Sequence, residues 1–170
     1  MNLIVAVDRN WGIGYRGELL ARLRADMKHF AALTTGRVVV LGSKTLLTFP
    51  GKRPLKNRTN IILSRREDFN PEGAFVVHSE AELLDELKKH KLEDVFVIGG
   101  ESVYKLLLPY CDRAYVTRFD KAFVADAYFP DLLASGEWEL ISCGEPQISD
   151  PSTDSEGGLV FRFCEYVRMK

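Results

Sequence analysis

Residues 95–108 read VFVIGGESVYKLLL, an apolar run that passes through two glycines directly into an amphipathic pattern. The continuous apolar character of 95–99 predicts a strand that is covered on both faces, as in a parallel sheet. The segment that follows predicts a helix that opens at Gly100 and ends at Pro109. A buried strand that leads straight into a helix is the unit from which α/β folds are built.

Similar apolar runs recur on the N-terminal side of this unit. They are LIVAV (3–7), VVVL (38–41), NIILS (60–64) and AFVV (74–77). The clearest helix between runs is SEAELLDELKKHK (79–91), where Ser79 and Glu82 form a capping box and the lysines complement the C-terminal dipole. This part of the chain predicts a mainly parallel sheet with flanking helices.

The last third of the chain has a different pattern. Segments RAYVTRF (113–119), EWELISC (137–143) and LVFRFCEYV (159–167) alternate in polarity, which favours strands toward a sheet edge that include an antiparallel pair. Residues 145–158 are rich in Ser, Asp, Pro and Gly and predict a loop. With no internal repeat or linker, we expect one α/β domain over residues 1–170.

Composition points to a small-molecule partner. Lys and Arg number 23 against 24 Asp and Glu, a net charge of -1, so no global field favours nucleic acid or an anionic membrane. The run at 3–7 is too short for a signal segment or a membrane span, which predicts a cytoplasmic protein. Cys111, Cys143 and Cys164 form no metal-binding pattern, and we expect reduced cysteines that serve packing.

An acid lies within an apolar stripe of the segment GELLARLRADMKHFAALTTG (17–36). If the segment is helical, successive side chains turn by about 100°, and four apolar side chains then point within roughly 40° of one direction, with Asp26 in their middle. These residues are Leu19, Leu23, Phe30 and Leu33. The alternative is that Asp26 is an N-cap or first-turn residue and that Leu19 and Leu23 precede the helix. A carboxylate removed from water gains partners or rises in pKa, and either outcome indicates a functional site.

Glycines suggest where a dinucleotide could bind. Residues 12–17 spell GxGxxG, the Rossmann fingerprint, but Asp8 to Trp11 separate it from the strand, and the helix after it would bury Asp26 against its own sheet. We interpret these glycines as a flexible loop. Better donors follow three other strands, at GSKT (42–45), LSRR (63–66) and Gly99-Gly100, and together they suit the phosphates of NADP.

Taken together, these stretches resemble dihydrofolate reductase of the bacterial chromosomal type. The segments that carry the resemblance are AVDRNWGIG (6–14), ADMKHF (25–30), VVVLGSKT (38–45), RTNIILSR (58–65), VIGGESVY (97–104), YVTRF (115–119) and DAYFP (126–130). The family implies a mainly parallel sheet with an antiparallel C-terminal strand. It also implies a monomer that reduces 7,8-dihydrofolate with NADPH, in support of tetrahydrofolate synthesis and one-carbon metabolism.

The resemblance assigns roles at the substrate. Asp26 would hold the pterin and promote protonation at N5, Thr117 would hydrogen-bond its carboxylate, and Arg58 would pair with the glutamate α-carboxylate. Leu19 matches a substrate-side residue of a mobile loop. The apolar residues of the pocket would be Val5, Ala6, Phe30, Phe49, Leu55 and Ile98.

The resemblance also assigns a cofactor site and no metal. Lys44 and Thr45 would contact the pyrophosphate, Ser64 and Arg65 the adenosine 2'-phosphate, and Gly99-Gly100 would form a cis peptide. The remaining residues that would contact the cofactor are Ala6, Ile13, Gly14, Gly42, Ser43, Leu63, Ile98, Glu101, Ser102, Val103 and Tyr104.

The chain departs from the usual family pattern at several positions. Leu20 and Ala21 replace Pro-Trp, Arg24 replaces proline, Ser43 replaces arginine and Ala127 replaces threonine. Two alternatives share the cofactor chemistry: a pyrimidine reductase of the riboflavin pathway, against which Asp26 and Arg58 argue, and a non-catalytic pterin- or nucleotide-binding module.

Overall fold

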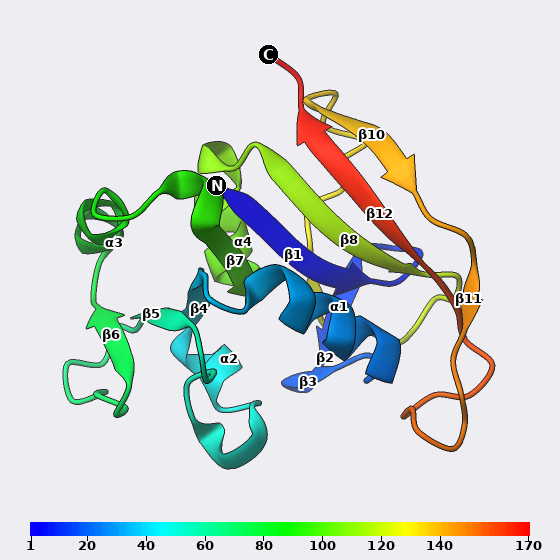
Figure 1. Ribbon diagram of the computed structural model, residues 1–170, viewed down its shortest axis with the longest axis horizontal. Helices are drawn as coiled ribbons and strands as arrows, with labels where there is room; N and C mark the ends of the chain where they lie inside the picture. Colours follow the sequence, from blue (N-terminus) through cyan, green and yellow to red (C-terminus); the bar gives the residue numbers. More distant parts are fainter.

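A computed structural model describes residues 1–170 as an α/β fold built around one large sheet (Figure 1). The strand order is β10-β12-β8-β1-β7-β4-β5-β6, and β11 pairs with β12. The strands are β1 (Asn2–Val7), β4 (Val38–Gly42), β5 (Thr59–Leu63), β6 (Ala74–Val77), β7 (Val95–Gly99), β8 (Arg113–Phe119), β10 (Trp138–Cys143), β11 (Gln147–Ile148) and β12 (Val160–Arg168).

The predicted division between parallel and antiparallel strands is confirmed. Strands β1, β4, β5, β6, β7 and β8 run parallel, whereas β12 is antiparallel to β8 and β10. The register sets Ala6 of β1 and Phe163 of β12 on either side of Thr117. The predicted loop at 145–158 holds the two-residue strand β11 as well.

Four α-helices flank the sheet: α1 (Arg24–Thr34), α2 (Ser43–Leu46), α3 (Glu80–Leu87) and α4 (Glu101–Leu107). Single helical turns lie at Pro50–Lys52, Leu92–Asp94 and Leu108–Tyr110. As predicted, α4 follows Gly100, and Ser79 caps α3 by accepting the N–H of Glu82 at 3.1 Å. No helix is long and apolar enough to cross a membrane.

Helix α3 differs from its prediction in two details. It ends at Leu87, so the lysines lie at and beyond its C-cap instead of in its last turn. The Glu82 carboxylate accepts the N–H of His78, one residue before the N-cap, so the reciprocal half of the capping box is not formed. Lys88 and Lys89 pair with Asp85 and Glu86 instead.

The prediction of a flexible loop at 12–17 was wrong. Residues Gly12–Tyr15 form β2, which pairs with β3 (Glu18–Leu19) and with β9 (Ala127–Tyr128) in a separate antiparallel sheet. The Asp8 carboxylate anchors its start by accepting the N–H groups of Asn10 and Gly12, each at 2.8 Å. A Cβ atom at Gly12 would lie 2.8 Å from the Ala125 Cβ, so this glycine serves close packing.

The expectation of three reduced cysteines was also wrong. Cys143 of β10 and Cys164 of β12 stand opposite each other in the antiparallel register and form a disulfide, while Cys111 is a buried free thiol. The two cysteines can form a disulfide because β10 and β12 are neighbours in the sheet, and their spacing along the chain does not reveal this.

Candidate active site

An apolar cleft of about 170 Å³ opens between α1, α2 and the carboxyl ends of β1 and β7, with the β2-β3 hairpin at its rim. Residues expected from the sequence line much of it: Val5, Ala6, Ile13, Leu19, Asp26, Phe30, Thr45, Phe49, Leu55, Ile98 and Tyr104. The residues at the ends of β1 and β7 reach it because parallel strands end at one edge of the sheet, where α/β folds place their ligands.

Asp26 is the only acid that lines the cleft. The Thr117 hydroxyl, from the centre of β8, donates to Asp26 Oδ1 at 2.6 Å. Burial raises the pKa of Asp26 above its ordinary value, and the hydrogen bond from Thr117 lowers it in part. Two opposing effects therefore set the pKa of this carboxyl group: burial, which is the larger, and the hydrogen bond from one protein donor.

The predicted helical stripe was wrong about where the helix begins. Helix α1 starts at Arg24, with Leu23 as N-cap, and Leu19 belongs to the β2-β3 hairpin. Asp26 is thus a first-turn residue, as the alternative interpretation had it. The apolar surroundings that made the stripe informative remain, because Leu19 reaches the cleft from the hairpin.

Tyr104 of α4 lines the same cleft as Asp26. Its hydroxyl donates to the Ile4 carbonyl at 2.7 Å, and burial together with the negative charge of Asp26 raises its pKa. A Cβ atom at Gly99 would lie 3.5 Å from the Tyr104 ring, and the Gly99-Gly100 peptide bond is cis, as the resemblance implies. A Cβ atom at Gly100 would stand 3.1 Å from Thr45 Oγ1, so the absence of a side chain keeps this side of the cleft open.

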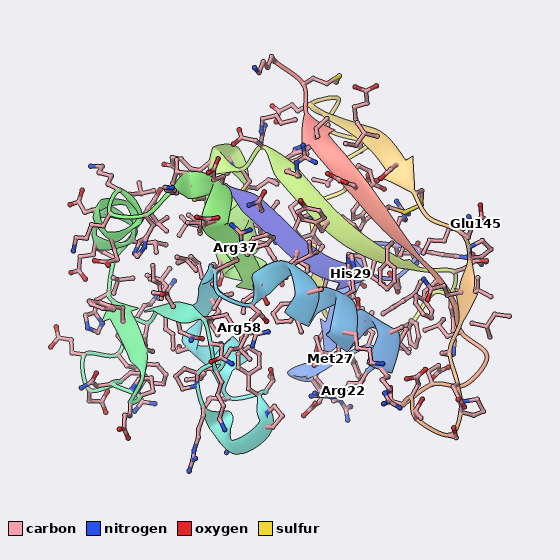
Figure 2. The ribbon with its side chains drawn as sticks, in the orientation of Figure 1. Arg22, Met27, His29, Arg37, Arg58 and Glu145 are labelled. Atoms are coloured by element: carbon pink, nitrogen blue, oxygen red, sulfur yellow. A yellow bond between two sulfur atoms is a disulfide. The ribbon has the colours of Figure 1, made fainter.

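Arg58 lies at the far end of α1, outside the residues that line the cleft. Its Nε donates to Thr34 Oγ1 at 3.2 Å, its Nη1 donates to the Lys56 carbonyl at 2.7 Å, and its guanidinium lies 5.9 Å from the ring centre of Phe30. Burial lowers its pKa, and no carboxylate pairs with it. In Figure 2, Arg58, Met27 and Arg22 follow one another along one side of α1, and His29 lies toward the sheet.

The donors expected at a cofactor lie at the carboxyl ends of β4, β5 and β7. Helix α2 starts at Ser43 after Gly42, which leaves Lys44 exposed and outside every ion pair. Arg65 is also exposed and unpaired, whereas Arg66 binds the Asp68 carboxylate through two hydrogen bonds. Of the two arginines of the LSRR segment, Arg65 alone is therefore left without a carboxylate partner.

The other residues predicted to contact the cofactor range from buried to exposed positions. Ser64 is buried, and its hydroxyl accepts the N–H of Arg66 at 3.2 Å. Glu101 accepts a hydrogen bond from Lys105 at 2.8 Å, while Val103 packs in the core. The rest lie where their elements place them: Gly14 in β2, Leu63 at the end of β5 and Ser102 on the exposed side of α4.

Sequence reasoning missed several lining residues: Ile4, Leu20, Ala21, Arg22, Met27, Thr48, Pro50 and Phe119. Met27 lies three residues before Phe30, on the same side of the helix, so helical geometry could have indicated it. Ala21 is buried in a small hydrophobic cluster that also contains Leu23, Phe119, Leu159 and Phe161.

Comparisons with known proteins agree with this geometry. The family model described as dihydrofolate reductase matches residues 1–168. The dihydrofolate reductase of Sus scrofa is 37% identical over 187 residues, covering 99% of this chain and 97% of the relative. That of Staphylococcus aureus is 33% identical over 170 residues, covering 100% and 99%.

A solved structure gives the same result. Dihydrofolate reductase from Enterococcus faecalis, complexed with NADP(H) and RAB-propyl, matches with a TM-score of 0.84 and 34% identity, over 99% of this chain and 96% of that one. The family match spans nearly the whole chain, and the relatives are covered almost completely. The chain therefore belongs to the dihydrofolate reductase family.

Proposed function

We propose that this chain catalyses the NADPH-dependent reduction of 7,8-dihydrofolate to 5,6,7,8-tetrahydrofolate. The observation that carries the proposal is the Asp26 carboxyl group, hydrogen-bonded by Thr117 at 2.6 Å within an apolar cleft. Such a pair suits a flat heterocycle that presents adjacent N–H donors on one edge and an apolar face to the walls. Membership of the family supports the same reaction.

The pterin would bind through its 2-amino group and neighbouring ring nitrogen to Asp26, which has one oxygen engaged by Thr117 and the other free of protein donors. Carboxylate hydrogen bonds of this kind are short and strong because the acceptor is charged. Val5, Ala6 and Ile98 would contact one side of the ring system, and Phe30 with Phe49 the other. The glutamate tail would extend past Phe30 to Arg58, because the planar guanidinium of arginine suits a carboxylate.

A proton must reach N5 of the pterin for the reaction to balance. Burial raises the pKa of Asp26, so this acid exchanges its proton nearer to neutral pH than an exposed aspartate does. It would promote protonation at N5 while it holds the opposite edge of the ring. Thr117 keeps the carboxyl group oriented, since its hydroxyl is fixed to β8.

The residues at the strand ends fit a phosphorylated dinucleotide. Gly100 lacks the side chain that would crowd Thr45, Lys44 is unpaired at the start of α2, and Arg65 is unpaired after β5. Lys44 and Thr45 would hold the pyrophosphate, and Ser64 with Arg65 the 2'-phosphate that distinguishes NADPH from NADH. When bound, NADPH supplies the hydride that is added at C6 of the pterin.

The β2-β3 hairpin would cover the reacting ring and exclude water. Asp126 ties the hairpin down, because its N–H donates to the Gly14 carbonyl and its carboxylate accepts the N–H of Arg16, each at 3.0 Å. Ile13 and Leu19 then point into the cleft from the two strands of the hairpin. Lids of this type commonly govern turnover.

We further propose that the protein works as a cytoplasmic monomer in tetrahydrofolate synthesis and one-carbon metabolism, without nucleic-acid or membrane partners. The near-neutral charge of -1 supports the absence of polyanionic partners. The monomeric state rests on the family resemblance.

The loss of NADPH absorbance on addition of 7,8-dihydrofolate tests the proposal, with NADH and a substrate-free blank beside it. We expect rapid, dihydrofolate-dependent oxidation that prefers NADPH. Binding of NADPH without consumption in the presence of dihydrofolate would refute the proposed activity and favour a pterin- or nucleotide-binding module or a reductase of another heterocycle.

A further inference from the structure

The helix that carries Asp26 begins without a cap of its own. Its N-cap residue is Leu23, whose side chain has no hydrogen-bond acceptor for the free N–H groups of the first turn. The N–H of Arg24 instead donates to Asp154 Oδ1 at 2.7 Å. Asp154 lies 130 residues further along the chain, so a remote loop supplies the cap.

The loop that holds Asp154 is closed by its own hydrogen bonds. Asp154 Oδ2 accepts the N–H of Asp150 at 2.8 Å, and the N–H of Asp154 donates to the Asp150 carbonyl at 2.9 Å. Ser155 binds the backbone of Arg22, the residue before the N-cap: its hydroxyl accepts the N–H of Arg22 at 2.7 Å, and its N–H donates to the Arg22 carbonyl at 3.0 Å. In Figure 1 this loop, between β11 and β12, lies beside the N-terminal end of α1.

The same loop is also anchored to the ends of β8 and β12. The buried Ser149 hydroxyl donates to the Glu156 carbonyl at 2.5 Å and accepts the N–H of Leu159, just before β12, at 2.8 Å. Glu156 pairs with Lys121, which follows β8. Asp154 therefore links the start of α1 to β8 and β12, and β8 carries Thr117.

We propose that Asp154 is a positioning residue for dihydrofolate reduction: it fixes the first turn of α1 so that Asp26 stays within hydrogen-bonding distance of Thr117. Asp26 is two residues beyond the N–H that Asp154 accepts, in the same helical turn. A shift of this turn would change the distance between Asp26 and Thr117 and would thereby weaken the binding of the pterin. The inference rests on the proposed function, because its main measurement is turnover of dihydrofolate.

The position of the donor offers a sharp test. A proline at residue 24 has no N–H, so it would make the acceptor at Asp154 unnecessary. The helix should accept it, because Leu23 has φ -111° and ψ 130°, the conformation a residue before proline prefers, and proline is favoured at the first helical position. The need for Asp154 therefore follows from the free N–H that Arg24 presents at this position.

The experiment compares Asp154→Ala, Asp154→Asn, Arg24→Pro and the Arg24→Pro/Asp154→Ala double variant. Glu145→Ala, an exposed acid in the connection between β10 and β11, is the control. We expect Asp154→Ala to lower kcat/KM for dihydrofolate about fivefold, the usual scale of a lost cap. The loss should lie mainly in KM, with a changed pH profile and unchanged NADPH affinity. Asp154→Asn keeps an oxygen acceptor and should restore much of the activity.

Rescue by proline decides the result. In the Arg24→Pro background, Asp154→Ala should have little further effect, and an undiminished loss there would overturn the inference. So would an Asp154→Ala variant that melts at a lower temperature but keeps the wild-type KM and pH profile. Amide hydrogen exchange in residues 25–30, expected to rise in Asp154→Ala and to recover with proline at residue 24, needs no turnover. It therefore separates failure of this inference from an inactive wild type, which would refute the proposed function.

Discussion

Removal of the Thr117 hydroxyl tests how the active-site acid is controlled. Thr117 is 3% exposed, and valine has nearly its shape, so Thr117→Val deletes the 2.6 Å hydrogen bond to Asp26 with little change in packing. A hydrogen bond to a charged group contributes about 1.5 to 3 kcal/mol, which corresponds to about 10- to 150-fold in an equilibrium constant. That is the range we expect for the weakening of dihydrofolate binding at neutral pH.

The sign of the pH dependence follows from the same contact. The hydrogen bond from Thr117 lowers the pKa of Asp26 against the larger effect of burial, so the variant should have a higher pKa than the wild type. The ionised carboxylate is the form that accepts the N–H donors of the pterin. The defect should therefore be largest at low pH and shrink as the pH rises above the new pKa.

The assay is KM for dihydrofolate from pH 5 to 9, with NADPH affinity as an internal reference. Thr117→Ser is the matched control, because it keeps the hydroxyl and should retain most of the wild-type profile. A Thr117→Val enzyme with the KM and pH profile of the wild type would refute the reasoning. It would mean that the contact does not influence substrate binding.

Three further predictions concern single side chains. Burial raises the pKa of Asp26, so the folded state loses stability as pH rises through the folded-state pKa and the acid ionises. Asp26→Asn should therefore increase the urea midpoint of unfolding at pH 7. The gain should vanish below pH 3.8, where the acid is protonated in both the folded and the unfolded state. Arg65→Ala should weaken NADPH binding about tenfold or more by titration but leave NADH unaffected, and Arg66→Ala, whose arginine already binds Asp68, should change neither. Arg58→Ala should raise KM for dihydrofolate about tenfold or more while sparing a dihydropterin that lacks the glutamate tail; equal effects on both substrates would refute this assignment.

The parallel core could be predicted because each of its strands is a continuous apolar run. The strands at 38–42 and 95–99 are buried on both faces, so their pattern is dominated by burial and needs no knowledge of neighbours. Helix α4 could also be predicted from local sequence, since two glycines mark the point where the strand ends and the helix begins.

Elements that depend on distant partners could not be predicted. The hairpin at residues 12–19 is held partly by β9, where Gly12 pairs with Tyr128, and a four-residue strand rich in glycine has no pattern of its own. The Cys143-Cys164 pairing likewise needs the register of β10 and β12. Local sequence does not contain this information.

The candidate site shows both situations at once. Asp26 was recognised from its apolar neighbours although the helix begins later than expected, because Leu19 reaches the cleft by another route. The role of Asp154 was invisible, because the acceptor for a helix N–H lies 130 residues away in a loop. Arg66 looked equivalent to Arg65 until its pairing with Asp68 was known.

Transfer of deuterium tests the central claim most directly. The protein is mixed with dihydrofolate and NADPH that carries deuterium in the transferable position at C4, and the pterin product is analysed by mass spectrometry and NMR. We predict one deuterium at C6 of tetrahydrofolate with the wild type and little product with Asp26→Asn at neutral pH. Oxidation of the cofactor without deuterium in the pterin, or full labelling by Asp26→Asn, would contradict the account.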